Sequence, residues 1–196
     1  MEISDDLRPI IEKLKSKEIA ERRKAIKELK ALKSEEEGTN LLIDLIEKSP
    51  DSLVREGACI ALGELEAKKG IDVLIKALND KDDGVRFQAI IALGEIGDSK
   101  AVEPLLEKIR KREKAIIRSE AAKALGKIGD SKAVNHLINV IHKEKDRFVK
   151  REAVRALGEI GDKKAVKKLR QLTQRERDHD IVLAAMEVLE KLESED

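Results

Sequence analysis

The side chains that most often perform catalysis or bind metals are few in this chain, and they are widely spaced. The histidines are His136, His142 and His179, and the single cysteine is Cys59. His136 and His142 are six residues apart, a spacing that does not place two ligands on one face of a helix. The sequence has no glycine-rich phosphate loop after a strand, no nucleophile elbow and no cysteine-based zinc pattern. We therefore predict surface histidines, a buried inert thiol, no metal, no cofactor and no catalysis.

A basic residue directly after an apolar one recurs at four places, and we call this set the ladder. A positive side chain at the start of a helix opposes the helix dipole, so each member needs an acidic or carbonyl partner nearby. We interpret the ladder as structural, with a row of phosphate-binding groups as the alternative. The ladder consists of Arg55, Arg86, Arg118 and Lys150. The available acidic partners are Asp51, Asp80, Asp82, Asp83 and Asp146.

These residues belong to a repeated unit. The triplet Ala-Leu-Gly occurs with its leucine at Leu62, Leu93, Leu125 and Leu157, at intervals of 31, 32 and 32 residues. Similar apolar segments lie 33 residues before the first triplet and 32 after the last, so we count six repeats. Such a period is typical of a solenoid, in which each unit buries its apolar face against its neighbours. We predict one domain over residues 1–196, with repeats at about 4–34, 38–68, 70–97, 98–129, 130–161 and 162–193.

Each repeat is predicted to contain two helices, which gives twelve helices and an all-α fold. In residues 98–109 the apolar positions follow a period of 3.6 residues, and a second apolar face runs from Ile117 to Ile128. Gly129 is suited to end that second helix, and Asp130 to cap the next first helix. Gly97-Asp98 and Gly161-Asp162 repeat this pattern. The joints between repeats are therefore expected to be tight.

The glycine of each triplet needs its own explanation, because a glycine inside a helix costs about 1 kcal/mol relative to alanine. We attribute Gly63, Gly94, Gly126 and Gly158 to close approach of neighbouring backbones. The equivalent positions in the outer repeats are Lys30 and Glu190, which is typical of terminal caps.

The repeat resembles the short HEAT-like repeats named after phycobilisome lyases. The likeness is carried by Val85-Arg86 through Ala92-Leu93-Gly94-Glu95-Ile96-Gly97-Asp98, followed by Lys100-Ala101-Val102, and it extends over nearly the whole chain. The resemblance implies an armadillo-type, right-handed α–α superhelix, with second helices on the concave side and first helices on the convex side. Binding scaffolds, chromophore lyase subunits, metal-dependent hydroxylases and relatives of DNA glycosylases share this architecture, so the fold alone does not specify a function.

Iron chemistry does not transfer from the hydroxylase relatives. Those enzymes hold two iron atoms with His-Glu pairs early in the second helices. Glu120 and Glu152 match the glutamate of such pairs, but no histidine precedes either of them. The matching positions are Glu56-Gly57, Phe87-Gln88, Ser119-Glu120 and Arg151-Glu152.

A candidate partner surface lies on the second helices, at positions six and two residues before each core leucine and two residues after it. We call this surface the second-helix face. Ile60, Phe87 and Ile91 form an apolar spot on it, as expected of a protein interaction patch, with Phe87 as the anchor. The alternative is that these three residues belong to the core between repeats. Basic residues of the same face, predicted to select an acidic part of the partner, are Lys123, Lys127, Arg151 and Arg155.

Charge is balanced overall but distributed unevenly. Residues 99–178 carry a net charge of +11, and the remainder carries −10. This asymmetry indicates either a solvated surface or a footprint for an acidic partner, nucleic acid included. Phe87 and Phe148 are the only aromatic residues, so stacking on bases is disfavoured.

We predict a noncatalytic, monomeric scaffold that binds a protein or peptide on the second-helix face. The first alternative is electrostatic binding of nucleic acid by the basic half, and the second is a phycobilin lyase-like subunit. The chain has no apolar run long enough to span a bilayer and begins with an acidic segment, so we expect a cytoplasmic protein without a membrane partner.

Overall fold

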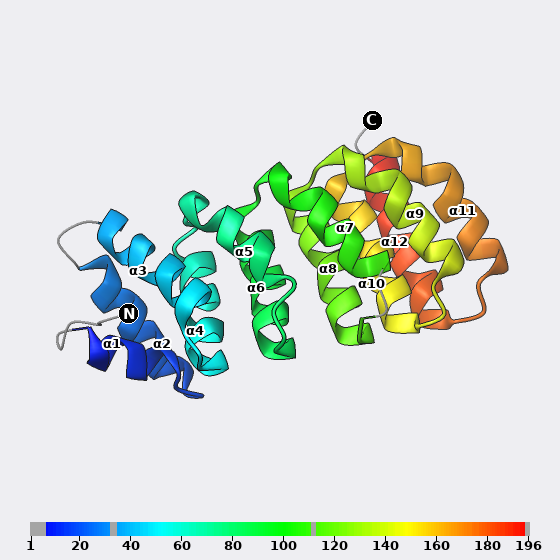
Figure 1. The fold of residues 1–196 in the computed structure, drawn as a ribbon. Helices are drawn as coiled ribbons and strands as arrows, with labels where there is room; N and C mark the ends of the chain where they lie inside the picture. Colours follow the sequence, from blue (N-terminus) through cyan, green and yellow to red (C-terminus); the bar gives the residue numbers. More distant parts are fainter. Residues whose placement is uncertain (1–6, 32–34, 111–112, 195–196) are drawn as a thin grey trace. The chain divides into compact units, whose positions relative to one another are not determined.

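A computed structural model describes residues 7–31, 35–110 and 113–194 (Figure 1). Over these ranges the regular structure is entirely helical and forms six pairs of α-helices, as predicted. The pairs are α1 (Arg8–Leu14) and α2 (Ile19–Lys30), α3 (Glu35–Lys48) and α4 (Ser52–Glu64), α5 (Ile71–Ala77) and α6 (Asp83–Ile96), α7 (Val102–Arg110) and α8 (Ala115–Ile128), α9 (Val134–Lys143) and α10 (Arg147–Ile160), and α11 (Val166–Arg175) and α12 (His179–Ser194). Residues 4–6 and 32–34 of the first predicted repeat lie outside the described ranges.

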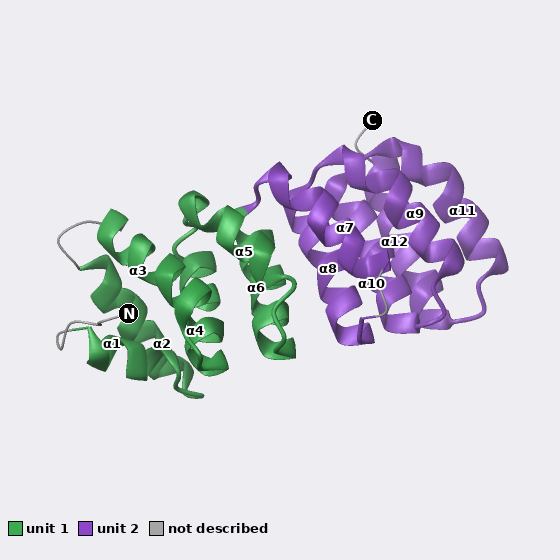
Figure 2. Cartoon of the chain, in the orientation of Figure 1, with its two compact units in different colours: residues 1–96 green, residues 97–196 purple. Residues whose placement is uncertain are grey.

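The chain divides into two compact units, residues 1–96 and residues 97–196 (Figure 2). The first unit contains α1–α6 and the second contains α7–α12. Each unit is described by itself below. The single domain over 1–196 therefore stays a prediction.

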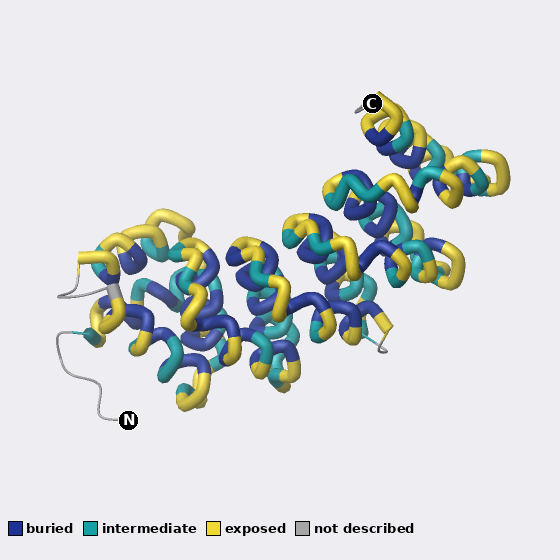
Figure 3. The backbone as a smooth tube through the Cα atoms, turned by 90° about the horizontal axis from the view of Figure 1, so that it is seen from above, coloured by how far each residue is buried: buried dark blue, intermediate teal, exposed yellow. Residues whose placement is uncertain are grey.

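Second helices of neighbouring repeats pack side by side within each unit. In the first unit α4 contacts α6; in the second, α8 contacts α10 and α10 contacts α12. Their facing sides are apolar and buried, and Ala58, Cys59 and Leu62 are 0% exposed. Figure 3 shows that buried positions alternate with exposed ones along the helices, so that each helix has a buried side. Burial raises the pKa of the Cys59 thiol to about 12, so this thiol stays protonated near neutral pH.

Two of the triplet glycines lie where neighbouring backbones come closest, as predicted. A Cβ atom on Gly63 would lie 2.9 Å from the Cα of Ala92, and one on Gly126 would lie 2.9 Å from the Cα of Ala156. Backbone atoms cannot move aside as the end of a flexible side chain can. At Gly158 the three nearest atoms all belong to the Val188 side chain, the first of them at 2.6 Å, so no backbone atom is among them.

The joints between repeats contain a short element that the sequence pattern did not predict. Gly129 ends α8 with a φ of 73°, and Gly161 ends α10 with a φ of 77°, a left-handed conformation that glycine adopts without strain. The following aspartate does not cap the next α-helix directly. The Asp130 carboxylate accepts a hydrogen bond from the Lys132 N–H and caps a 3-10 turn over Ser131–Ala133, after which α9 begins. The equivalent turns are Lys68–Gly70, Ser99–Ala101 and Lys163–Ala165.

The ladder residue Arg55 joins two successive repeats. Its guanidinium donates two hydrogen bonds of 2.8 Å to the Asp80 carboxylate in the turn of the next repeat. It also donates to the main-chain oxygens of Ser49 and Pro50, in the turn that leads into its own helix. The Asp80 carboxylate in turn accepts from the Asp82 N–H, at 2.9 Å.

The same arrangement recurs in the second unit. Arg118 donates through Nε and Nη2 to Glu144, at 3.0 and 3.2 Å, and Lys150 donates to Glu176 at 2.7 Å. Both glutamates also accept main-chain N–H groups of their own turns. Arg86 pairs with Asp83 and donates hydrogen bonds to the main-chain oxygens of Asp80 and Lys81.

The predicted acidic partners are correct only in part. Asp80 and Asp83 pair with ladder residues, whereas Glu144 and Glu176 are partners that the sequence pattern did not predict. The carboxylates of Asp51, Asp82 and Asp146 instead accept main-chain N–H groups at the starts of α4, α6 and α10.

We expect Gly126→Ala to destabilise the protein by about 1–3 kcal/mol, although alanine favours helices, because its Cβ would overlap the α10 backbone. Urea unfolding followed by circular dichroism measures the change. Lys127→Ala, on the adjacent exposed position, is the control and should leave the midpoint nearly unchanged. A stabilised Gly126→Ala protein would refute the close approach.

We expect Arg55→Met to lower the free energy of unfolding by about 2 kcal/mol, because it leaves the partly buried Asp80 carboxylate without its cation. The matched control is Lys76→Met, which removes an ion pair to Glu47 whose lysine is 72% exposed, and no measurable change is expected there. If the two substitutions lowered the free energy of unfolding equally, the structural role of the ladder would be refuted.

Acidic pH should weaken the ion pairs that join successive repeats. The hydrogen bond from Lys150 lowers the pKa of Glu176. Burial by itself raises the pKa of Glu144, but main-chain hydrogen bonds and Arg118 outweigh this effect and hold the pKa below its ordinary value. The stability from both groups is present above the unfolded carboxyl pKa, about 4, and is lost as pH falls through the lower folded pKa. Urea midpoints measured against pH should therefore fall in acid, and they should fall less steeply for Glu144→Gln. If the midpoint of Glu144→Gln fell with pH as steeply as that of the wild type, ionisation of Glu144 would not contribute to stability.

Candidate functional site

The apolar spot predicted in the first unit lies at the edge of the core. Ile60 on α4 and Phe87 and Ile91 on α6 are half-buried, whereas Cys59 and Ile90 next to them are 0% exposed. The helical register is therefore the predicted one, but less of the Phe87 ring is available than the sequence suggested. Acidic residues of the same face surround the spot: Glu56, Glu64 and Glu95. Burial, and next the nearby Asp82 carboxylate, raise the pKa of Glu56.

The basic residues predicted for this face all belong to the second unit. Lys123, Lys127 and Arg155 are exposed, and Arg151 is half-buried. Three of them contact acidic residues of their own helices. Lys123 pairs with Glu120 at 3.3 Å, and Arg151 and Arg155 pair with Glu152 at 3.4 and 3.1 Å. Ladder residues contribute little to this face, because their charged ends are held in the joints.

Exposed apolar residues that were not predicted from the sequence lie at the second position of three second helices. Leu53 on α4 is 43% exposed, Ile116 on α8 is 58% exposed and Phe148 on α10 is 49% exposed. Each directly precedes the apolar–basic pair of the ladder and lies outside the apolar stripe that fills the core. Their position in the sequence could have identified them as exposed, because a large apolar residue outside the stripe that fills the core has no apolar partner within its own repeat.

Phe148 is held between two cations. The Arg147 guanidinium carbon lies 4.9 Å from the ring centroid, and that of Arg151 lies 5.5 Å from it, both within cation–π range. Phe148, Arg151 and Arg155 follow an i, i+3, i+7 spacing, so they share one side of α10. Ile116 has the equivalent position on α8, which packs along α10. In the second unit, the second-helix face therefore combines exposed apolar side chains with a field of positive charge.

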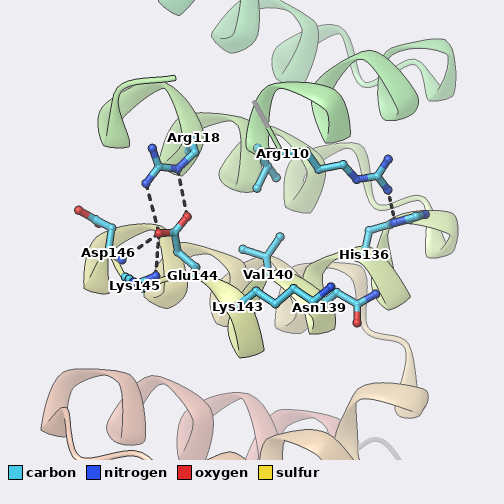
Figure 4. A pocket seen from close by; sticks show the side chains of 10 residues that line it. Arg110, Arg118, His136, Asn139, Val140, Lys143, Glu144, Lys145 and Asp146 are labelled. Carbon is cyan, nitrogen blue, oxygen red and sulfur yellow. Dashed lines mark hydrogen bonds and ion pairs between the residues drawn. The ribbon is translucent and has the colours of Figure 1, made fainter. Parts of the chain in front are cut away.

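A separate groove lies between α7 and α9 of the second unit, with a volume of about 1300 Å³ (Figure 4). The ion pair between Arg118 and Glu144 closes one end, and Arg110 meets His136 at the other. Because arginine can only donate, the Nδ1 atom of His136 is the acceptor of that hydrogen bond. The groove was not predicted from the sequence. Its walls are formed by Ile109, Arg110, Arg118, His136, Asn139, Val140, Lys143, Glu144, Lys145 and Asp146.

The described residues contain no group of three or more histidine, cysteine, aspartate and glutamate side chains arranged to hold a metal ion. His142 and His179 lie exposed on α9 and at the start of α12. In the same part of the chain, no helix has both the length and the apolar character needed to cross a membrane. The surfaces found here offer apolar contact, hydrogen bonding and charge, which are the means of binding.

Known structures share this fold. An engineered protein is 24% identical, with a TM-score of 0.64, and the match covers 97% of each chain. The complex of CpcE and CpcF of phycocyanin lyase from Nostoc sp. PCC7120 is 25% identical, with a TM-score of 0.67, and the match covers 80% of this chain and 65% of that one. A designed armadillo repeat protein in complex with the peptide (KR)4 is 18% identical, with a TM-score of 0.62, and the match covers 96% of this chain and 100% of that one.

Among curated proteins, no sequence matches the chain. The sequence model of HEAT repeats matches residues 7–84, 39–119, 71–153 and 102–190. These overlapping matches follow the helix pairs of the structure. The resemblance found in the sequence is therefore confirmed, and the chain belongs to the HEAT-repeat family.

Proposed function

We propose that the protein is a noncatalytic scaffold that binds a protein or peptide on its second-helix face. The observation that carries this proposal is the exposed Phe148 ring held between Arg147 and Arg151. Aromatic and arginine side chains contribute most to binding energy at protein interfaces. The two guanidinium groups also restrain the ring, so less side-chain entropy is lost when a partner covers it.

The chemistry of this surface selects the partner. Ile116 and Phe148 offer apolar contact, while Lys123, Lys127 and Arg155 add positive charge beside them. The complementary partner is a segment that combines apolar and acidic side chains, and the charge would also speed its association. The designed armadillo protein in complex with (KR)4 supports this proposal, because a related fold there accommodates a charged peptide. Here the cations lie on the scaffold, so the expected peptide has the opposite charge.

The first unit supplies a second proposed contact, through Ile60, Phe87 and Ile91. Its acidic surroundings would suit a basic or neutral segment of a partner. We keep Phe87 as the proposed anchor of this unit, with a smaller exposed area than Phe148. A monomeric state and a cytoplasmic location belong to the same proposal.

Two other functions have weaker support. Binding of nucleic acid by the basic half would rest largely on phosphate contacts, because Phe148 is the one exposed phenylalanine ring described beside the cations of that half on which a base could stack. A phycobilin lyase-like subunit is favoured by the structural likeness to the CpcE–CpcF complex. That function predicts measurable binding or transfer of a bilin in the presence of a partner protein.

We expect Phe148→Ala to weaken partner binding by about 30-fold, the effect of losing a hot-spot side chain worth about 2 kcal/mol. Affinity capture from the native cell extract identifies the partner, and titration of the purified partner gives the affinity. Ile19→Ala is the matched control, since Ile19 is 60% exposed and lies on α2 of the first unit, whereas Phe148 belongs to the second. Unchanged affinity of a folded Phe148→Ala protein would overturn the proposal for the second unit.

The same titration with Phe87→Ala and Ile91→Ala together tests the contact on the first unit. Nuclease treatment during capture separates the nucleic-acid alternative. A capture that nuclease abolishes, and that neither apolar variant affects, would move the function to phosphate binding by the basic half.

A further inference from the structure

The groove between α7 and α9 is distinct from the surface of the proposed function. Its walls belong mainly to first helices, whereas the second-helix face belongs to α8 and α10. It lies entirely within the second unit, so its shape does not depend on how the two units are placed. The groove can therefore be considered as a separate binding site.

The uncompensated charge of the groove is positive. Arg118 and Glu144 neutralise each other through two hydrogen bonds. The Asp146 carboxylate accepts the N–H groups of Phe148 and Val149 at the positive N-terminus of α10. Among the described residues Lys143 and Lys145 make no ion pair, and both are exposed. Arg110 is also exposed, and its partner His136 accepts a hydrogen bond on Nδ1, so the pair keeps the positive charge of Arg110.

The remaining walls suit a polypeptide. Ile109, which is 5% exposed, and the half-buried Val140 form an apolar floor. Asn139 is exposed and has no hydrogen-bond partner within the described ranges, and its carboxamide can both donate to and accept from a peptide unit. No phenylalanine, tyrosine or tryptophan lines the groove, so His136 supplies the one ring among its lining residues on which a nucleic-acid base could stack.

We propose that this groove binds an acidic, partly apolar segment of a partner protein in an extended conformation. Carboxylates of the segment pair with Arg110, Lys143 and Lys145. An apolar side chain covers Ile109 and Val140, and a main-chain amide binds Asn139. The site is independent of the second-helix face and gives the second unit two surfaces for acidic ligands.

The histidines provide a readout specific to the groove. Of the three, His136 lines the groove and the other two do not, so the proton NMR signal of its imidazole ring reports binding there. The probe is a synthetic peptide in which pairs of glutamates alternate with single leucines, added to the full chain. His136→Gln assigns the signal. We expect a saturable shift of the His136 signal, with the His142 and His179 signals unmoved.

Matched charge reversals locate the contact. Lys143→Glu with Lys145→Glu should raise the midpoint of the His136 titration about tenfold or more, equivalent to about 1.4 kcal/mol. Lys123→Glu with Lys127→Glu makes the same charge change on the second-helix face and should leave that midpoint unchanged. The second pair tests the function proposed above through its own partner titration, so the two proposals can fail separately.

Three results would overturn the groove proposal. One is a His136 signal that does not move when the peptide is in excess. Another is an equal midpoint in the wild type and in a folded Lys143→Glu, Lys145→Glu protein. The last is a His136 titration whose midpoint lies at a lower concentration of oligodeoxythymidylate than of the peptide, which would make the groove a phosphate-binding site.

Discussion

The approach of one second helix to the next is the constraint on which the rest of the structure depends. Gly126 lies against the backbone of Ala156, and Gly63 lies against that of Ala92. Contacts this close leave no room for a side chain, so the facing sides of the helices must be small, apolar and nearly constant. The period of the sequence follows directly from that requirement. The opposite sides of the same helices have no such requirement, and for this reason charge and apolar residues vary there from repeat to repeat.

Close packing along the second helices leaves the turns to be joined by other means. Arg55 and Arg118 each bind an acidic residue of the following repeat and main-chain oxygens of the turn before their own helix. The acidic residues are fixed by main-chain N–H groups, so the ion pairs form with little loss of side-chain entropy. In a protein whose aromatic residues number only two, these polar joints supply orientation that a bulky core would otherwise provide.

Features set by local periodicity were predictable from the sequence, and those set by contacts across repeats were less so. The helix pairs, the left-handed glycines and the close approach at Gly126 follow from spacing within one unit. The 3-10 turn after Asp130 was missed because a capping aspartate looks the same before either kind of helix. Glu144 was missed because the pairing joins residues 26 positions apart in sequence. Phe148 was not predicted because it lies nine residues before the core leucine Leu157, outside the positions that define the second-helix face. The groove depends on the spacing of α7 and α9, which sequence alone does not give. The binding roles of Phe87, Lys123, Lys127, Arg151 and Arg155 stay predictions.

The pair of Arg118 and Glu144 belongs both to a joint and to a wall of the groove. Separating the fourth and fifth repeats would break the pair and open the groove at that end. Under the proposal made for the groove, a ligand seated there would resist such separation, and tension that draws the repeats apart would favour its release. Ligand occupancy and mechanical load would then be coupled through one ion pair.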